Sequence, residues 1–431
     1  MNTNIVRYSF VSIALILLIV TTNINWGKND WKGALESDAK GYYAYLPAVF
    51  IYNDLNFSFL EGVEAKYDQK HLYYDYRSNA HGVLINKYYG GVSVLQLPFF
   101  LGAHALTMLT NGDTDGYSKY YMLSISLASW FYQLFGLYFI VLLLQFYQVK
   151  PNIIALVLVA ISFGTNLYVY TIVEAGMSHV YSFAMVAAFL YFAHKAFVLG
   201  QNRYLLRSSL LLGLIVLCRP INAQVVLFLP FLFGNGKDFL LQLKSTLSST
   251  SSIVRLMIPF GLVISFQLIY YKLATGHFLV YSYDEEGFNF TNPEWMNFLF
   301  SYKKGLFLYT PIYFLATLSL FFVKKLSVFQ KATWFLAMSV VVYIFSSWWM
   351  WFYGGGFSGR GMVEFIPLFM LPLALFLNQL KGHKKIFALE SVVLLIVVCQ
   401  IQSYQYRYYE IHYSEMTQEK YWDVFLLRNR F

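Results

Sequence analysis

The sequence predicts an all-α polytopic membrane protein, and its composition and its apolar runs carry this prediction. Hydrophobic residues make up 58% of the 431 residues, charged residues make up only 12%, and the mean hydropathy is +0.51. A soluble domain of this length could not keep so much apolar surface in water. Runs of roughly 20 apolar residues recur from end to end, and each is long enough to cross the hydrocarbon core of a membrane.

The apolar runs predict about 11 transmembrane helices. The first run lacks a clear small-residue cleavage site and precedes many others, so we expect a retained anchor and not a cleaved signal peptide. Two of the runs are short, which predicts broken or tilted helices. Residues 1–404 would form the transmembrane domain, followed by a short, aromatic and charged outer tail, residues 405–431. The predicted spans are 5–23, 119–147, 152–173, 180–199, 205–219 (short), 222–235 (short), 254–273, 305–323, 332–349, 362–380 and 386–404.

Charge decides the place of a twelfth apolar stretch, residues 92–109. If this stretch does not cross, Lys and Arg dominate the loops on the N-terminal side, and Asp238 is the only acid there. That positive-inside pattern puts the N-terminus in the cytoplasm and residues 24–118 in a long first outer loop. If the stretch did cross, the bias would reverse, so we expect a juxtamembrane helix within the outer loop. A true span compensated by a later half-helix is the alternative.

The same charge distribution limits the partners and the location of the protein. The net charge of +9 comes from the cytoplasmic loops, so it sets orientation and predicts no nucleic-acid partner. We expect an integral protein of a bacterial inner (plasma) membrane whose functional site lies outside the cytoplasm. Cys218 and Cys399 are the only cysteines, and both lie in apolar runs. This argues against a disulfide framework and excludes a Cys-based metal site.

Asp38 is the first candidate site residue. It lies at the start of the long outer loop, shortly after the first apolar run, and Tyr42 and Tyr43 follow it. A carboxylate can take a proton from an attacking hydroxyl, and aromatic rings can stack on the apolar faces of sugar rings. The alternatives are a solvated loop acid and an interfacial belt of tyrosines.

Glu174 and His179 form a second candidate, in the short outer turn between the third and fourth spans. An acid and an imidazole five residues apart across a Gly-containing turn can face one cavity. There they could bind a metal, or orient an acceptor or a phosphate. The alternative is a helix N-terminus capped by Ser178, with Glu174 solvated.

Basic residues on the outer side are candidates for binding an anion. Arg219 lies between two short spans, and an arginine at membrane depth should face a cavity or an anion unless its side chain reaches the headgroups. Arg360 follows a glycine-rich turn, where the backbone can approach a ligand and a guanidinium can bind phosphate. A flexible outer loop is the alternative. Lys303 and Lys304 are a further basic pair that could meet a lipid phosphate.

Together these features resemble the GT-C superfamily of integral membrane glycosyltransferases, near its protein O-mannosyltransferase and aminoarabinose-transferase branch. The resemblance covers residues 1–380 in architecture. It lies in the N-terminal span, in a long outer loop with a juxtamembrane helix and an acid soon after the membrane (Asp38), in an acidic turn after the third span (Glu174), and in an outer Gly/Arg segment before a helix (Gly359-Arg360).

The resemblance implies transfer of a sugar from a polyprenyl-phosphate donor, bound among membrane lipids, to a hydroxyl acceptor on the outer face. It makes Asp38 the candidate general base. Glu174 and His179 become its partners from the second loop. Arg360 and Arg219 become candidates for the donor phosphate. The first-loop acid is single where the family pattern has a pair, so we assign no metal site and no certain cofactor; a divalent metal is possible but not indicated.

Two other functions stay open from the sequence. A transporter or flippase of a lipid-linked sugar would also use broken helices and basic groups within the membrane, although the sequence shows no inverted repeat. A surface-polysaccharide polymerase or ligase would share the outer face and the lipid carrier. Such enzymes usually place their large outer loop late in the chain, whereas here it comes first.

Overall fold

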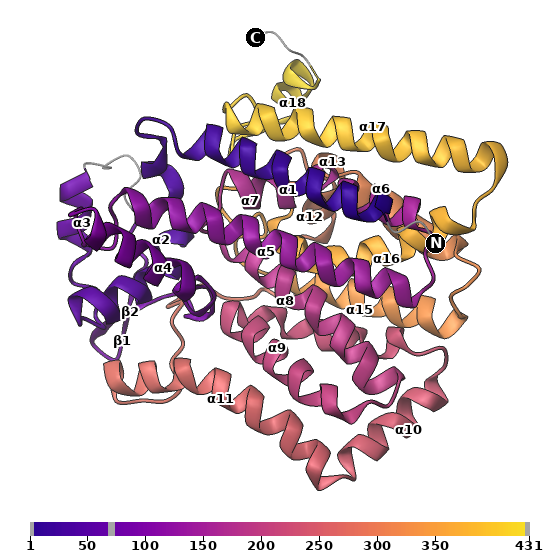
Figure 1. Ribbon diagram of the computed structural model, residues 1–431, viewed down its shortest axis with the longest axis horizontal. Coiled ribbons are helices and arrows are strands. Elements are labelled where there is room, and N and C mark those ends of the chain that lie inside the picture. Colours follow the sequence, from indigo (N-terminus) through magenta and orange to yellow (C-terminus); the bar gives the residue numbers. More distant parts are fainter. Residues whose placement is uncertain (1–3, 68–73, 427–431) are drawn as a thin grey trace.

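The computed structural model describes residues 4–67 and 74–426 and confirms a mostly helical chain (Figure 1). Helices hold 71% of the described residues. The described part contains one β-hairpin, in which β1 (Arg77–Ala80) and β2 (Val83–Asn86) pair antiparallel. Both cysteines are free and buried.

Eight helices among the described residues are long and apolar enough to cross a membrane, or nine if one bent pair is counted. The predicted number of about 11 crossings is therefore not confirmed. One of the eight is α4, so the juxtamembrane placement of residues 92–109 stays a prediction. The eight are α1 (Asn4–Asn25), α4 (Gly91–Leu109), α5 (Lys119–Phe146), α8 (Ser178–Ala193) with η4 (His194–Val198), α11 (Thr250–Thr275), α15 (Val328–Ser346), η8 (Arg360–Phe365) with α16 (Ile366–Gln379), and α17 (Gly382–Arg407).

Several predicted spans are short or interrupted helices, which explains why the structure has fewer long apolar helices than the predicted number of spans. These are α6 (Pro151–Gly164) with α7 (Leu167–Ile172), α9 (Leu205–Cys218), the 3₁₀ helices η6 (Pro220–Phe228) and η7 (Pro230–Leu232), and α13 (Leu306–Tyr309) with α14 (Ile312–Phe322). The interruptions fall at Asn166, Pro220 and Pro311. Proline removes a helix hydrogen bond, and just before Asn166 the hydroxyl of Thr165 accepts from the backbone N–H of Leu167 at 3.2 Å.

Two of the interruptions meet in a buried polar layer. Tyr313 donates a hydrogen bond to Asn166 Oδ1 at 2.9 Å, and Asn166 Nδ2 donates to the carbonyl of Gly359 at 3.4 Å. Thr310 Oγ1 donates to Ser358 Oγ at 3.0 Å. An interrupted helix at membrane depth is tolerated only where it is buried in protein or lines a cavity. The polar layer therefore supports the segment that leads into η8.

The long first loop folds at one end of the molecule, away from the N-terminus (Figure 1). It holds η1 (Asp30–Ala34), α2 (Asp38–Pro47), the π-helix η2 (Ala48–Tyr52), α3 (Leu60–Tyr67), the hairpin and α4. The remaining short elements are η5 (Asn202–Tyr204), α10 (Gly236–Leu247), α12 (Trp295–Phe300) and α18 (Gln418–Val424). The predicted tail contains α18, and residues 427–431 lie outside the described residues.

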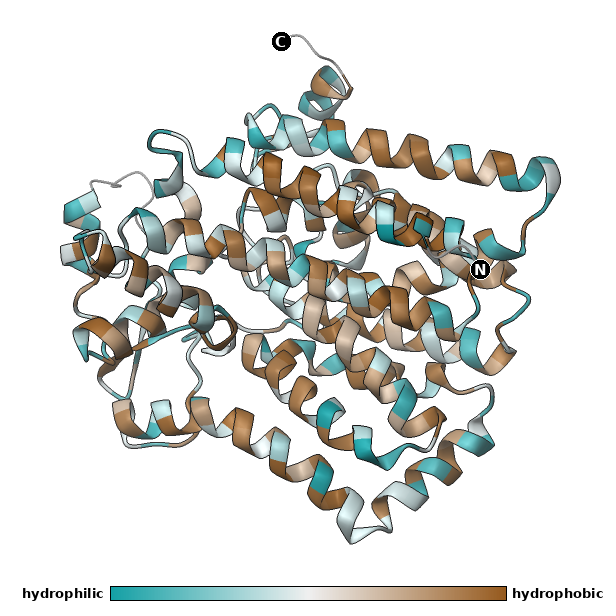
Figure 2. Ribbon diagram, in the orientation of Figure 1, coloured by the Kyte–Doolittle hydropathy of each residue, from teal (hydrophilic) through white to brown (hydrophobic). Residues whose placement is uncertain are grey.

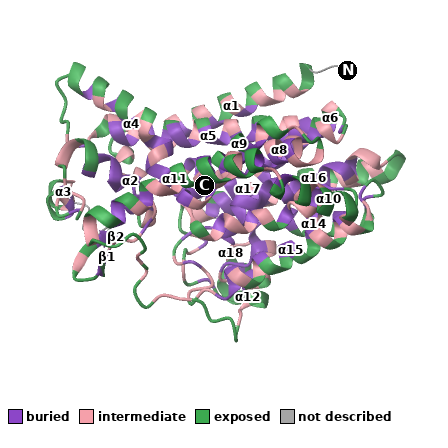
Figure 3. Cartoon of the chain, turned by 90° about the horizontal axis from the view of Figure 1, so that it is seen from below, coloured by how far each residue is buried: buried purple, intermediate pink, exposed green. Residues whose placement is uncertain are grey.

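Helices α8 and α16 form the buried centre, and apolar helices surround them. Buried residues make up 83% of the apolar window of α8–η4 and 89% of that of η8–α16, against 17% for α1 and α11 and 22% for α17. Figure 2 shows hydrophobic residues along these outer helices and hydrophilic loops at both ends, and Figure 3 shows α1 largely exposed at an edge of the molecule. An exposed apolar surface of this extent is typical of helices that face lipid.

Candidate functional site

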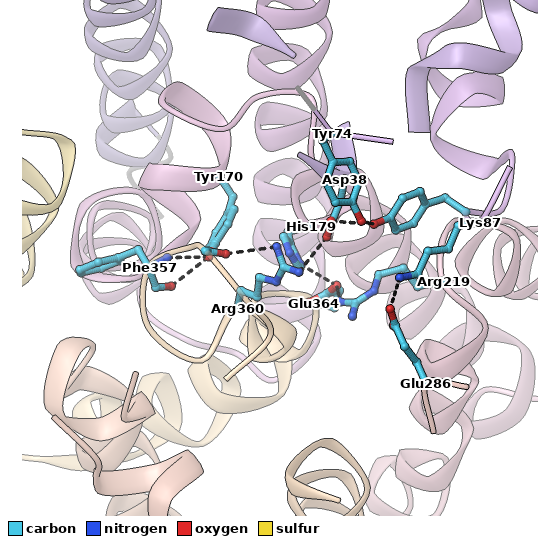
Figure 4. A network of polar contacts seen from close by, with 12 residues as sticks. Asp38, Tyr74, Lys87, Tyr170, His179, Arg219, Glu286, Phe357, Arg360 and Glu364 are labelled. Atoms are coloured by element: carbon cyan, nitrogen blue, oxygen red, sulfur yellow. Dashed lines mark hydrogen bonds and ion pairs between the residues drawn. The ribbon is translucent and has the colours of Figure 1, made fainter. Parts of the chain in front are cut away.

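Asp38 opens helix α2 and is held by two partners from distant parts of the chain (Figure 4). Tyr88 donates from Oη to Asp38 Oδ1 at 2.7 Å, and Arg360 donates from Nη2 to Asp38 Oδ2 at 2.7 Å. The hydroxyl of Tyr74 lies 2.7 Å from that of Tyr88 and extends this network. The side chains of Asp38 and Arg360 are only 17% and 12% exposed. Two predicted site residues thus form a direct and largely buried ion pair.

Close packing of the turn before α8 against α2 fixes the position of Asp38. A Cβ added to Gly176 would lie 2.8 Å from the Cβ of Ala39, so only glycine permits this approach. The first turn of a helix also favours a carboxylate, because backbone N–H groups point out of the helix there. The sequence therefore brings the Glu174 turn and Asp38 together, although they lie in separate loops.

The ion pair sets the protonation state of Asp38. Burial opposes ionisation of this carboxyl, but the Arg360 guanidinium and the Tyr88 hydroxyl outweigh it, so the pKa of Asp38 lies below its ordinary value. Asp38 is thus a carboxylate at neutral pH, as a proton acceptor must be. The depressed pKa also makes it a weak base while Arg360 stays bound to it.

Arg360 is presented by a glycine-rich loop and keeps one donor unused. Its Nη1 donates to the carbonyl of Gly355 at 3.4 Å, while Nη2 binds Asp38. Its Nε is buried and has no hydrogen-bond partner among the described residues. Gly356 adopts a φ of +140°, and a Cβ there would lie 2.9 Å from the hydroxyl of Tyr170, so the loop requires glycine at this position. The unused guanidinium donor could bind an anionic oxygen.

Glu364 is a buried acid that the sequence analysis did not assign to the site. Arg219 Nη1 donates to Glu364 Oε1 at 2.9 Å, and Nδ1 of His179 lies 3.0 Å from the same oxygen. The side chain of Glu364 is fully buried. Two predicted site residues, Arg219 and His179, therefore meet on this carboxylate (Figure 4). An acid at the start of an apolar run, four residues after Arg360, is the sequence signal that could have revealed it.

We expect Glu364→Gln to destabilise the protein by about 3–5 kcal/mol, because removal of one partner from a buried ion pair leaves the other charge uncompensated. The measurement is unfolding of the purified protein in detergent. Glu415→Gln is the control, since Glu415 is exposed and forms no ion pair with the described residues. The control should change stability by less than about 0.5 kcal/mol. Equally small effects in both variants would show that Glu364 does not hold Arg219 and His179.

Glu174, which is half-buried, and Lys304, which is buried, are two further ionisable groups close to Arg360. Tyr406 donates from its hydroxyl to Glu174 Oε1 at 2.7 Å. Burial raises the pKa of Glu174 despite this hydrogen bond and the nearby cations. Burial also lowers the pKa of Lys304 to about 7, although the negative charge of Glu174 acts to raise that pKa. The Lys304 ammonium donates a hydrogen bond to the carbonyl of Gly356. Lys304 is thus poised between two charge states at neutral pH, and a nearby anion would favour its charged form.

The other predicted site residues occupy different surroundings. The ammonium of Lys303 lies 3.5 Å from the centre of the Phe352 ring. Tyr42 packs against Tyr88 with ring centroids 4.7 Å apart, and burial raises the pKa of Tyr42 to about 12. Tyr43 is fully buried and donates to a backbone carbonyl just before α5. Tyr42 therefore borders the site, Tyr43 lies in the interior of the first loop, and Lys303 is engaged by an aromatic ring.

The acids around Asp38 do not make a metal site. In the described part of the chain, no three His, Cys, Asp or Glu side chains lie close enough to hold a metal ion together. Both oxygens of Asp38 are engaged by Tyr88 and Arg360, and Glu174 is bound by Tyr406. This donor set does not fit a bound metal, and no step of the proposed reaction passes through one.

The whole architecture is similar to that of a solved membrane enzyme. The apo structure of the Archaeoglobus fulgidus oligosaccharyltransferase superposes on 96% of this chain with a TM-score of 0.50 and 11% sequence identity. The chain shares the fold of that oligosaccharyltransferase. Two further structures of that enzyme are similar as well. The one with Zn and sulfate has a TM-score of 0.49 and 13% identity over 96% of this chain. The one with an inhibitory peptide and a dolichol-phosphate has a TM-score of 0.48 and 10% identity over 97% of this chain. No protein-family model matches the chain, and its sequence matches no curated protein.

The similarity confirms the GT-C resemblance at the level of the fold. This chain covers 57%, 54% and 57% of the three archaeal chains, so it spans little more than half the length of that enzyme. One fold can carry several activities, and activity has to be inferred from the residues of the site.

Proposed function

We propose that this chain is an integral membrane glycosyltransferase that moves a sugar from a polyprenyl-phosphate donor to a hydroxyl acceptor at the outer face of the membrane. The ion pair of Asp38 and Arg360, 2.7 Å long on a GT-C fold, is the observation that supports this most. It joins a proton acceptor to a phosphate-binding group. Sugar transfer from a phosphate needs both, a base for the acceptor hydroxyl and a cation for the leaving phosphate.

In the proposed reaction, donor binding opens the ion pair. The donor phosphate takes the guanidinium of Arg360, whose Nε has no partner among the described residues. Asp38 then loses the attraction that lowers its pKa, while burial, which raises that pKa, remains. Asp38 becomes a stronger base only when the donor is in place. This order would couple removal of the acceptor proton to the presence of the donor.

The transfer is a single in-line displacement. The acceptor oxygen forms a bond to the anomeric carbon while the bond from that carbon to the phosphate oxygen breaks, which inverts the anomeric centre. The acceptor proton passes to Asp38. The polyprenyl phosphate leaves with its charge neutralised by Arg360 and Lys304. Charge stabilisation of this kind in a site without bulk water contributes about 3–4 kcal/mol per donor group.

The remaining predicted residues support these groups in the proposal. Glu364 holds Arg219 and His179 beside the helix that carries Arg360, so Arg219 contributes positive charge near the phosphate without leaving its partner. Glu174 favours the charged form of Lys304. Tyr42 borders the acceptor. Lys303 borders the lipid headgroups.

A flippase of a lipid-linked sugar is the second candidate, because interrupted helices are typical of transporters as well. The two functions differ in the fate of the donor, since a transferase breaks the bond between sugar and phosphate and a flippase leaves it intact. A surface-polysaccharide polymerase or ligase would also break the donor bond, but its acceptor would be a polymer.

The test is incubation of the purified protein in lipid vesicles with a panel of radiolabelled polyprenyl-phosphate sugars and hydroxyl acceptors. We expect release of polyprenyl phosphate and movement of the label to an acceptor for at least one donor. Label that crosses the bilayer while still attached to its lipid would identify a flippase and contradict the proposal.

A further inference from the structure

The reaction proposed above assigns no role to a cleft that lies beside the Asp38 site. It lies between strand β1, residue Lys87, the segment 282–286 and Trp349, and is called the Trp349 cleft below. Its volume of about 1070 Å³ lies at the upper end of the range of ligand sites, about 300–1,000 Å³.

Hydrogen bonds join the walls of the Trp349 cleft, so its shape is fixed by the fold. Ser282 Oγ donates to the carbonyl of Lys87 at 2.7 Å, and Ser78 Oγ donates to the carbonyl of Ser282 at 2.8 Å. The backbone N–H of Trp349 donates to the carbonyl of Gly287 at 2.9 Å, which positions the indole next to the same segment. The cleft is therefore a built feature, and no rearrangement is needed to form it.

The Trp349 cleft leads to Asp38 through two tyrosines. Tyr283 lines the cleft, and its ring meets the ring of Tyr88 edge-on with centroids 6.3 Å apart. Tyr88 in turn donates to Asp38. Lys87 lines the cleft as well, directly before Tyr88 in the chain, and adds to the positive potential around Asp38. A molecule held in the cleft would have its inner end against Tyr283, whose ring is followed by Tyr88 and then by the proposed base.

The aromatic wall of the cleft suits a sugar ring. Trp349 is 53% exposed, so a face of its indole is open to a ligand in the cleft. An indole can stack on the apolar face of a pyranose while the sugar hydroxyls point to polar groups. The cleft offers such polar groups beside the indole.

The charges of the cleft disfavour a phosphorylated ligand. Four carboxylates and two cations line it. Both cations, Arg77 and Lys87, are already engaged in ion pairs with acids. Asp284 and Glu285 are exposed and make no hydrogen bond or ion pair with the described residues. The excess of negative charge would repel a phosphate, and the two unpaired carboxylates can accept hydrogen bonds from hydroxyl or amino groups.

We propose that the Trp349 cleft binds the acceptor as an oligosaccharide without phosphate groups, composed of neutral or amino sugars, and directs its terminal hydroxyl to Asp38. This inference rests on the proposed function and names the acceptor class. Trp349 stacks on a sugar ring, and Asp284 and Glu285 accept hydrogen bonds from its polar groups. The donor, which carries a phosphate, binds at Arg360 on the other side of Asp38.

Binding is measured on the full chain in nanodiscs without any donor. The probes are neutral tetrasaccharides of glucose, mannose and galactose, a tetrasaccharide of glucosamine, and phosphorylated forms of the neutral probes. We expect at least one unphosphorylated probe to bind, and Trp349→Ala to weaken its binding roughly tenfold. Trp295→Ala is the matched control, since Trp295 is 51% exposed and does not line the cleft. The control should bind as the wild type does.

Asp284→Asn combined with Glu285→Gln provides a second variant at exposed positions, where folding is not at risk. We expect it to weaken the amino-sugar probe more than the neutral probes. Three results would each overturn the proposal. They are failure of every probe to bind, equal binding by Trp349→Ala and the wild type, and tighter binding of the phosphorylated probes than of the unphosphorylated ones. Saccharide binding without cleavage of any polyprenyl-phosphate donor would contradict the transferase function and leave the binding site in place.

Discussion

Asp38→Asn should lower the rate of sugar transfer by about 10²- to 10⁴-fold, the usual contribution of a general base. Asparagine has the same size; its side-chain oxygen can accept from Arg360, and its amide NH2 can donate to the Tyr88 hydroxyl in place of the bond that Tyr88 now donates, so the site should keep its shape. It cannot take the acceptor proton. The loss should fall on kcat, and the KM for the donor should stay the same or decrease, because Arg360 is no longer bound by a carboxylate. Initial rates in vesicles with donor and acceptor varied separately measure both quantities.

Asp30→Asn is the matched control for Asp38. Asp30 lies in the same loop, is exposed, and forms no ion pair with the described residues. Its variant should transfer sugar at the wild-type rate. Full activity of Asp38→Asn would remove Asp38 from the reaction, and the assignment of the general base would then be wrong.

Arg360→Gln should raise the KM for the polyprenyl-phosphate donor roughly 10- to 100-fold, because a charge-assisted hydrogen bond contributes about 1.5–3 kcal/mol. The KM for the acceptor should change little, since the acceptor carries no phosphate in the proposed reaction. The fall in kcat should be smaller than for Asp38→Asn, because Lys304 still lies near the leaving group. The measurement is the same pair of titrations in vesicles.

Arg203→Gln is the control for loss of an arginine. Arg203 is exposed and lies in a loop predicted to face the cytoplasm, far from a donor bound outside. Its substitution should leave both KM values unchanged. A larger effect of Arg360→Gln on the acceptor than on the donor would place Arg360 at the acceptor and contradict its role at the phosphate.

The helical class and the GT-C fold could be predicted from the sequence because they depend on composition and on the order of apolar runs. The number of spans could not. Hydropathy does not register the break between α6 and α7, where the Thr165 hydroxyl accepts from the backbone N–H of Leu167 and the Asn166 side chain binds Tyr313 and Gly359. Proline interrupts helices, so the break at Pro220 and the short spans on either side of it were predicted from the sequence. The hairpin of the first loop has too few residues to show a clear alternating pattern.

The members of the site were easier to predict than their pairing. Asp38, Arg219 and Arg360 stood out because charged groups near the membrane need a partner or a ligand. Their pairing depends on tertiary contacts between distant loops, and no local sequence pattern encodes such contacts. Glu364 was missed because an acid at the start of an apolar helix is also a common solvated residue. Only the structure shows that it binds Arg219 and His179.

The central claim is that Arg360 controls Asp38 as a base, and the pH dependence of kcat/KM tests it most directly. In the wild type, the acid limb of the profile should lie below the ordinary range of an aspartate, because Arg360 and Tyr88 lower the pKa of Asp38 against the effect of burial. In Arg360→Gln, burial remains and the guanidinium is gone, so the acid limb should move to higher pH. An acid limb that stays in place, or that moves to lower pH, would contradict the account.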